Sequence, residues 1–294
     1  MSTAAISTTA EKQGRHLAFV AIVLISSLGC YRVLSALVHY SIQDDSSSHT
    51  ILIPFVSAVL LYLERRRIFS AAKASLGCGV GIMLAGAALY WVVGRSESAV
   101  AGSGQFSLAV FAVILMWWGG FVCCYGSMAT REALFPLLFL FLTVPFPQAL
   151  LDRVIYALQS GSTEIAYLVF QATGTPVLKH GFMLAVPGVT IEVAKECSSI
   201  RSSIALFITC LLAAHLYLRT SWKMALLVLV SLPLSILKNG VRIATLTLLS
   251  VYVTPDFLTG KLHRDGGFAF FAFALLLLWP VLWLLWRSEP KRDQ

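Results

Sequence analysis

Near the end of the chain, residues 268–286 form an unbroken run of nineteen residues (FAFFAFALLLLWPVLWLLW) with no charged side chain. An α-helix needs about 20 apolar residues to cross the hydrocarbon core of a bilayer, and this run has that length. A helix satisfies all its own backbone hydrogen bonds, so such a segment is stable in lipid. The run therefore predicts a membrane-spanning helix.

The composition shows that this run is typical of the whole chain. Of the 294 residues, 58% are hydrophobic and 12% are charged, against about 45–50% and about 25% in a soluble domain. These values exclude soluble globular, disordered and collagen-like chains. The apolar segments expected to form spans cover residues 17–38, 51–63, 76–93, 106–125, 134–144, 200–218, 224–253 and 268–286. We expect an all-α polytopic membrane protein with about eight transmembrane helices.

Residues 151–195 are expected not to span. Apolar residues recur there at roughly helical spacing up to residue 173, interrupted by the polar stretch QSGSTE at 159–164, which favours an interfacial or re-entrant amphipathic helix. Pro176, Gly181, Pro187 and Gly188 then flank short β-prone runs, which predicts a small external hairpin before the sixth helix.

The expected organisation follows from these segments. A cytoplasmic tail covers 1–16, and transmembrane helices one to five cover 17–150. The interfacial helix and hairpin cover 151–195, helices six to eight cover 196–287, and a second cytoplasmic tail covers 288–294.

The basic residues predict the orientation. In the first half, one side carries seven cations, whereas the other carries Arg95 and, within the outer half of the first span, Arg32; the seven are Lys12, Arg15, Arg65, Arg66, Arg67, Lys73 and Arg131. Cytoplasmic loops are enriched in Lys and Arg, so both termini are expected on the cytoplasmic side of the cytoplasmic (inner) membrane. The net charge of +8 does not indicate nucleic-acid binding, because the basic residues are spread among loops beside apolar runs.

Polar residues at membrane depth are costly and are therefore functional candidates. The first group is EVAKECSSIRSS at 192–203, where Cys197 enters the sixth span and Arg201 follows on the same helix face. A helix N-terminus stabilises a thiolate, and Ser198 or Ser199 could cap the helix. The alternative interpretation is an interfacial cysteine among capping serines.

Two later groups carry the remaining candidates. Lys238, Asn239 and Arg242 lie in the seventh span, with Arg242 about 28 Å from its inner end. His263 enters the eighth span from outside and could act as a general acid–base. A snorkelling arginine and an idle interfacial histidine are the simpler alternatives. The expected topology nevertheless brings Cys197, Arg242 and His263 to the same outer face.

These segments resemble the exosortase/archaeosortase family of membrane cysteine transpeptidases. Its motifs correspond to Cys197-Ser-Ser-Ile-Arg-Ser, to Asn239-Gly-Val-Arg242, and to His263 spaced by three residues from Gly267 and by seven from Phe271. The resemblance covers mainly residues 135–285. It departs at Ser199, where the family usually has glycine.

The resemblance implies a catalytic role for three residues: Cys197 as nucleophile, His263 as general acid–base and Arg242 as oxyanion or substrate stabiliser. Substrate-binding or supporting roles fall to Glu196, Ser198, Arg201, Lys238, Asn239 and Gly267. The implied substrates are exported proteins with a C-terminal motif, a transmembrane helix and a basic tail, which are sorted through a thioacyl-enzyme. The acceptor is unknown, either lipid or polysaccharide-linked, and the bacterial branch is linked to exopolysaccharide loci. Membrane lipids are the other expected partners.

Other functions stay open at this stage. Arg32, Lys238 and Arg242 could line the anion path of a transporter, or the same site could only hydrolyse its substrate. The histidines show no HExxH pattern or close pairing, so no metal site or cofactor is predicted. The carboxylate partner of His263 is equally open among Glu192, Glu196, Asp256 and Asp265.

Overall fold

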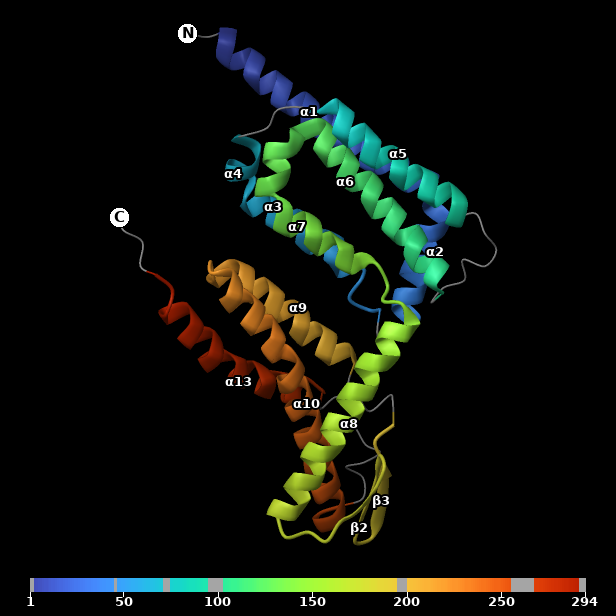
Figure 1. Ribbon diagram of the computed structural model, residues 1–294, viewed down its shortest axis with the longest axis vertical. Helices are drawn as coiled ribbons and strands as arrows, with labels where there is room; N and C mark the ends of the chain where they lie inside the picture. The colour runs from blue at the N-terminus through green and yellow to red at the C-terminus, as the bar shows by residue number, and fades with distance from the viewer. Residues whose placement is uncertain are drawn as a thin grey trace. The chain divides into compact units, whose positions relative to one another are not determined.

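The computed structural model describes residues 3–44, 47–70, 75–94, 103–194, 200–254 and 267–290. The chain divides into two compact units, residues 1–148 and 149–294, and each is described by itself. Figure 1 shows the helices and the small sheet of both units.

The first unit is built around one long buried helix. Its elements are α1 (Thr3–Gly29), α2 (Tyr31–Gln43), α3 (Leu52–Leu63), α4 (Arg65–Ser70), α5 (Leu76–Val93), α6 (Gly104–Glu132), α7 (Leu134–Phe139) and the 3₁₀ turn η1 (Leu140–Thr143). Helix α6 is buried along most of its length and lies beside α5 (Figure 1). A Cβ added at Gly119 of α6 would lie 2.6 Å from the backbone nitrogen of Met83 in α5. Glycine therefore allows the two backbones to approach closely.

Aromatic contacts join the helix ends of this unit in two separate sets. At one end, His16 Nδ1 lies 2.7 Å from the Tyr125 hydroxyl, and Phe69 packs against both rings. The other set contains Tyr40 and Phe106, whose ring centroids are 5.9 Å apart. The expected topology places the first set on the cytoplasmic side and the second set on the outer side. The two sets share no residue, as expected for helices that cross the membrane in alternating directions.

The second unit contains α8 (Gln148–Ala172), β1 (Leu178–His180), β2 (Met183–Val186), β3 (Val189–Glu192), α9 (Ile200–Tyr217), α10 (Ser221–Tyr252) and α13 (Gly267–Arg287). The strands form an antiparallel sheet in the order β1-β2-β3. Two cores hold the unit together. One joins α9, α10 and α13 through Leu206, Leu227 and Leu278, and the other packs the sheet against α8 and the distal part of α10.

The expected fold class is confirmed: the chain is helical, with one small sheet before a later helix. The count of eight spans is not reproduced. Within the described ranges, five helices are long and apolar enough to cross a membrane, or up to seven if each of two bent helix pairs is one span. The expected first span bends by 81° between α1 and α2, and α3 has only 12 residues.

The polar stretch 159–164 lies within a helix, as the expected amphipathic helix requires. Helix α8 is continuous over 25 residues, and Gln159, Ser162 and Thr163 on it are buried. These polar side chains bond to neighbouring elements and to α8 itself, with Gln159 contacting the chain after β3 and Ser162 contacting α10. The amphipathic pattern is therefore that of a helix whose polar residues face protein.

Candidate functional site

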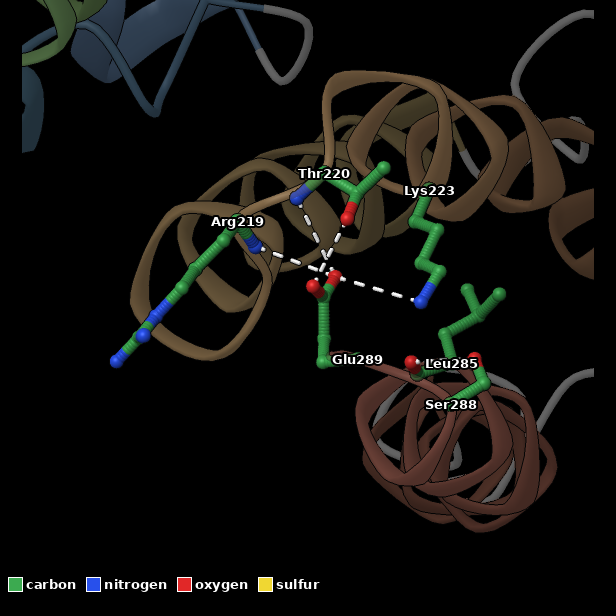
Figure 2. A network of polar contacts seen from close by, with 6 residues as sticks. All are labelled: Arg219, Thr220, Lys223, Leu285, Ser288 and Glu289. Atoms are coloured by element: carbon green, nitrogen blue, oxygen red, sulfur yellow. Dashed lines mark hydrogen bonds and ion pairs between the residues drawn. The ribbon is translucent and has the colours of Figure 1, made fainter. Parts of the chain in front are cut away.

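A polar junction fastens one end of the α9–α10–α13 bundle. Glu289, just after α13, accepts hydrogen bonds from the backbone N–H groups of Arg219 and Thr220, each at 3.3 Å, and from the Thr220 hydroxyl at 2.8 Å (Figure 2). Lys223 Nζ lies 3.7 Å from the same carboxylate. Thr220 is the N-cap residue of α10, and its hydroxyl donates to Glu289 and makes no capping bond, so Glu289 ties the turn before α10 to the end of α13.

The environment of Glu289 favours its charged form. Desolvation alone would raise the pKa of this carboxyl. The hydrogen bonds from Thr220 and the two backbone amides, together with the charge of Lys223, hold the pKa below its ordinary value.

The helices that leave this junction each cover about the thickness of a bilayer. At about 1.5 Å per residue, Ile200, Arg242 and Gly267 lie roughly 26, 28 and 30 Å from it along their helix axes. The start of α9, the Arg242 position of α10 and the start of α13 therefore reach a similar depth, at the end of the bundle opposite Glu289.

A buried lysine bonds to the start of α9 at this depth. Lys238 is 1% exposed, and its Nζ donates to the Ser202 hydroxyl on α9. Lys238 and Arg242 are four residues apart, so they share a face of α10. Arg242 is half-buried and Arg201 is exposed. This pairing fixes the register of α9 against α10 beside the candidate residues.

The next residue of α10 faces a different helix. The Asn239 amide, fully buried, donates to the Ser162 hydroxyl of α8 at 3.0 Å. Gly240 follows at the closest approach of the two helices: an added Cβ would lie 2.6 Å from Ile165 Cγ2 and 3.0 Å from the Ser162 carbonyl oxygen. The segment from Lys238 to Gly240 thus contacts α9 through Lys238 and α8 through Asn239 and Gly240.

The chain is also held at Val193, close to the end of the described range 103–194. Val193 is 1% exposed, its carbonyl accepts from the Gln159 amide, and its N–H donates to the Phe182 carbonyl at 3.0 Å. At the start of the next described range, Ser202 accepts from Lys238.

The expected site residues divide into two groups. Five of them lie in the described parts of α9, α10 and α13, namely Arg201, Lys238, Asn239, Arg242 and Gly267. Cys197, Glu196, Ser198 and His263 lie outside the described residues, as do the carboxylates Asp256 and Asp265.

Ser202, Ser162 and Gln159 were not among the expected site residues, although they bond to Lys238, to Asn239 and to Val193. For Ser162 and Gln159, the sequence did offer a signal, because both are polar residues at helical spacing within an apolar stretch. Within the described ranges, no three His, Cys, Asp or Glu side chains gather as a metal site.

The fold and this site define a polytopic membrane protein in which helices from its second half bring cationic and amide side chains together at one end of a bundle. A family model, the transmembrane exosortase (Exosortase_EpsH), matches residues 41–280, so the chain belongs to this family. Its members are generally transpeptidases, and membership implies substrates that carry sorting signals. No curated protein and no solved structure matches the chain.

Proposed function

We propose that the chain is a membrane cysteine transpeptidase that removes a C-terminal sorting tag from exported proteins and transfers them to an acceptor. Cys197 is the nucleophile, His263 the general acid–base and Arg242 the oxyanion stabiliser. The catalytic end of the bundle faces outside, because the positive-inside rule assigns the Arg219–Lys223 end to the cytoplasm.

The observation that carries the proposal is the common depth of Ile200, Arg242 and Gly267. Cys197 is three residues from Ile200, and His263 is four residues from Gly267. Chain length therefore limits their Cα atoms to within about 11 Å and about 14 Å of these helix ends. These short distances along the chain support the proposal that Cys197 and His263 act beside the Arg242 guanidinium.

The chemistry follows from these groups. The Cys197 thiolate attacks the scissile carbonyl, and Arg242 stabilises the negative charge that develops on its oxygen. The C–N bond then breaks, His263 gives its proton to the leaving amine, and the tag departs with its helix and basic tail. His263 next takes a proton from the acceptor nucleophile, which attacks the thioester and regenerates the thiolate.

The other residues have supporting roles in the proposal. Lys238 and Asn239 position α10 against α9 and α8, as their bonds to Ser202 and Ser162 support. Arg201 and Glu196 contribute to the charge around the thiol, Ser198 caps α9, and Gly267 opens α13 behind His263.

The direct test replaces Cys197 by alanine or serine and follows tag removal from a co-expressed substrate. Cys78 offers a matched control, because it is an exposed cysteine of the first unit. We expect Cys197→Ala to abolish tag removal and Cys78→Ala to leave it unchanged, with both variants inserted at normal levels. Undiminished processing by an inserted Cys197→Ala protein would refute the proposal.

Two measurements separate the remaining alternatives. The mass of the processed substrate distinguishes transfer, which adds the acceptor, from hydrolysis, which leaves a free carboxylate. Labelling with a membrane-impermeant thiol reagent tests the orientation and the reactive thiolate. Cys30, Cys123, Cys124 and Cys210 are buried, so a Cys78→Ser background leaves Cys197 as the thiol to be labelled. Slow labelling from outside would favour a transporter.

A further inference from the structure

The first unit contains a cavity of about 600 Å³ that the proposed chemistry does not use. Its lining comes from α1, α3, α4 and α6, at the end of the unit where His16 and Tyr125 meet. The buried rings of Phe121 and Tyr125 form part of its lining, and Phe19 packs edge-on against Phe121 at 5.6 Å. Because these rings and the His16–Tyr125 bond hold its walls, the cavity is largely pre-formed.

The cavity is apolar on one side and cationic on the other. Arg65 and Arg66 contribute guanidinium groups, and the lining includes no Asp or Glu. The Arg65 guanidinium lies 4.0 Å over the Tyr62 ring, and its Nη1 donates to the Tyr62 carbonyl at 2.7 Å. Some of its N–H donors are therefore already used by the protein. Arg66 is exposed and has no hydrogen bond or ion pair with any described residue.

Two carboxylates lie near this side without lining the cavity: Glu64 directly precedes the arginines in the sequence, and Glu132 forms an ion pair with Arg67, the third arginine of the run. The lining itself therefore carries two guanidinium groups and no carboxylate, which suits an anionic group.

The position of the cavity relative to the bilayer follows from its helices. The apolar part of α1 begins at Leu17, and α3 ends at Leu63, with Glu64 between it and the arginine run. The arginines thus lie at the level of the headgroups on the cytoplasmic side. Val20 and Leu61 also line the cavity, and Val20 is 52% exposed, so the apolar wall continues toward the hydrocarbon.

We propose that this cavity binds an anionic phospholipid of the cytoplasmic leaflet. The phosphate lies against Arg65 and Arg66, and the first part of an acyl chain follows the wall formed by Phe19, Val20 and Leu61. Basic pockets between membrane helices on the cytoplasmic side are suited to anionic headgroups. Inorganic phosphate shares the headgroup chemistry but has nothing to fill the apolar wall. The proposal concerns the first unit alone and does not depend on the transpeptidase activity.

The test measures lipid binding to the purified full-length protein in detergent by native mass spectrometry. Phosphatidylglycerol is compared with phosphatidylcholine of the same acyl chains. Arg66→Gln should weaken phosphatidylglycerol binding about fivefold, the effect of one cation at an anionic surface. Arg131→Gln is the matched control, because it removes the same charge from an exposed site that does not line the cavity. Ala58→Trp fills the cavity while both arginines remain, and should abolish the preference for phosphatidylglycerol.

Three results would overturn the proposal. Equal losses in Arg66→Gln and Arg131→Gln would mean that a diffuse charge attracts the lipid. Undiminished binding by Ala58→Trp would place the lipid elsewhere. Full competition by millimolar inorganic phosphate, with no difference between long and short acyl chains, would identify the ligand as free phosphate.

Discussion

Gly240 is the residue at which a single methyl group tests the packing around the candidate site. A Cβ there would overlap Ile165 Cβ and would lie 2.6 Å from Ile165 Cγ2, and ordinary contacts begin near 3.4 Å, so α8 and α10 must separate by at least about 0.8 Å. Ile165 is β-branched and cannot rotate freely out of the way. Since Asn239 and Arg242 flank this position, the separation displaces the proposed oxyanion stabiliser.

The expected effects of Gly240→Ala on stability and on activity differ in size. Overpacking costs about 1–3 kcal/mol, while the better helix propensity of alanine returns about 1 kcal/mol. The net loss of stability is therefore about 0–2 kcal/mol. A displacement approaching 1 Å at a catalytic constellation lowers the rate by up to about 100-fold. We expect tag removal to fall about 10- to 100-fold in a protein that still inserts.

The assay compares tag removal and thermal unfolding in detergent for Gly240→Ala and Gly81→Ala. Gly81 lies on α5 with open space around it, so alanine there gains helix propensity without a clash. Adding Ile165→Gly to the Gly240→Ala variant removes both Cβ and Cγ2 and should restore part of the lost rate. If Gly240→Ala behaves like Gly81→Ala in both measurements, the close packing of α8 on α10 has no functional consequence and the reasoning is wrong.

Three further predictions concern polar contacts. Ser202→Ala should destabilise the protein by about 1–3 kcal/mol, because it removes an acceptor of the buried Lys238 ammonium, whereas Lys238→Met should cost less, because Ser202 is only half-buried; a double-mutant cycle in detergent should give a coupling of at least about 0.5 kcal/mol, and additive effects would contradict the contact. The pKa of Glu289 is lowered in the folded state, so its contribution to stability is present above the ordinary value near 4.5 and is lost as the pH falls through the folded pKa. Melting temperatures should show a smaller acid-side decrease for Glu289→Gln than for the parent protein, with the exposed Glu164→Gln as control. Arg67→Gln should change the free energy of unfolding by less than about 1 kcal/mol, because its ion pair with Glu132 is largely exposed; a larger change in chemical denaturation would show a structural role.

The sequence was sufficient for the fold class because hydropathy alone determines which segments suit lipid. It could not determine where those segments bend. Residues 17–38 are apolar enough for one span, and the helix breaks at Cys30, just after Ser26, Ser27 and Gly29. Such residues do not set a bend by themselves; here α2 packs beyond the break against Phe106 and Val110 of α6. For a related reason, the sequence predicts a helix around the polar stretch in α8 but not what that stretch contacts. Whether Ser162 faces water or α10 depends on a partner 77 residues away.

The candidate site shows the same division. Lys238 and Asn239 stood out because polar residues are rare at membrane depth, and both are buried at a helix contact. Their partners could not be assigned, because Ser202 and Ser162 are ordinary residues that acquire meaning only through the packing of α9 and α8 on α10. Cys197 and His263 remain predictions that depend on the proposed chemistry.

The Glu289 junction also has a consequence for how the protein is made. Glu289 lies 70 residues after Arg219, so it is synthesised long after the α9–α10 turn has formed. Until α13 is inserted, the amides of Arg219 and Thr220 and the Lys223 ammonium depend on water and lipid headgroups for partners. The helix α13, inserted after α9 and α10, therefore brings in the carboxylate that satisfies the turn between them. The polar groups of this turn reach their final partners only when Glu289 is in place.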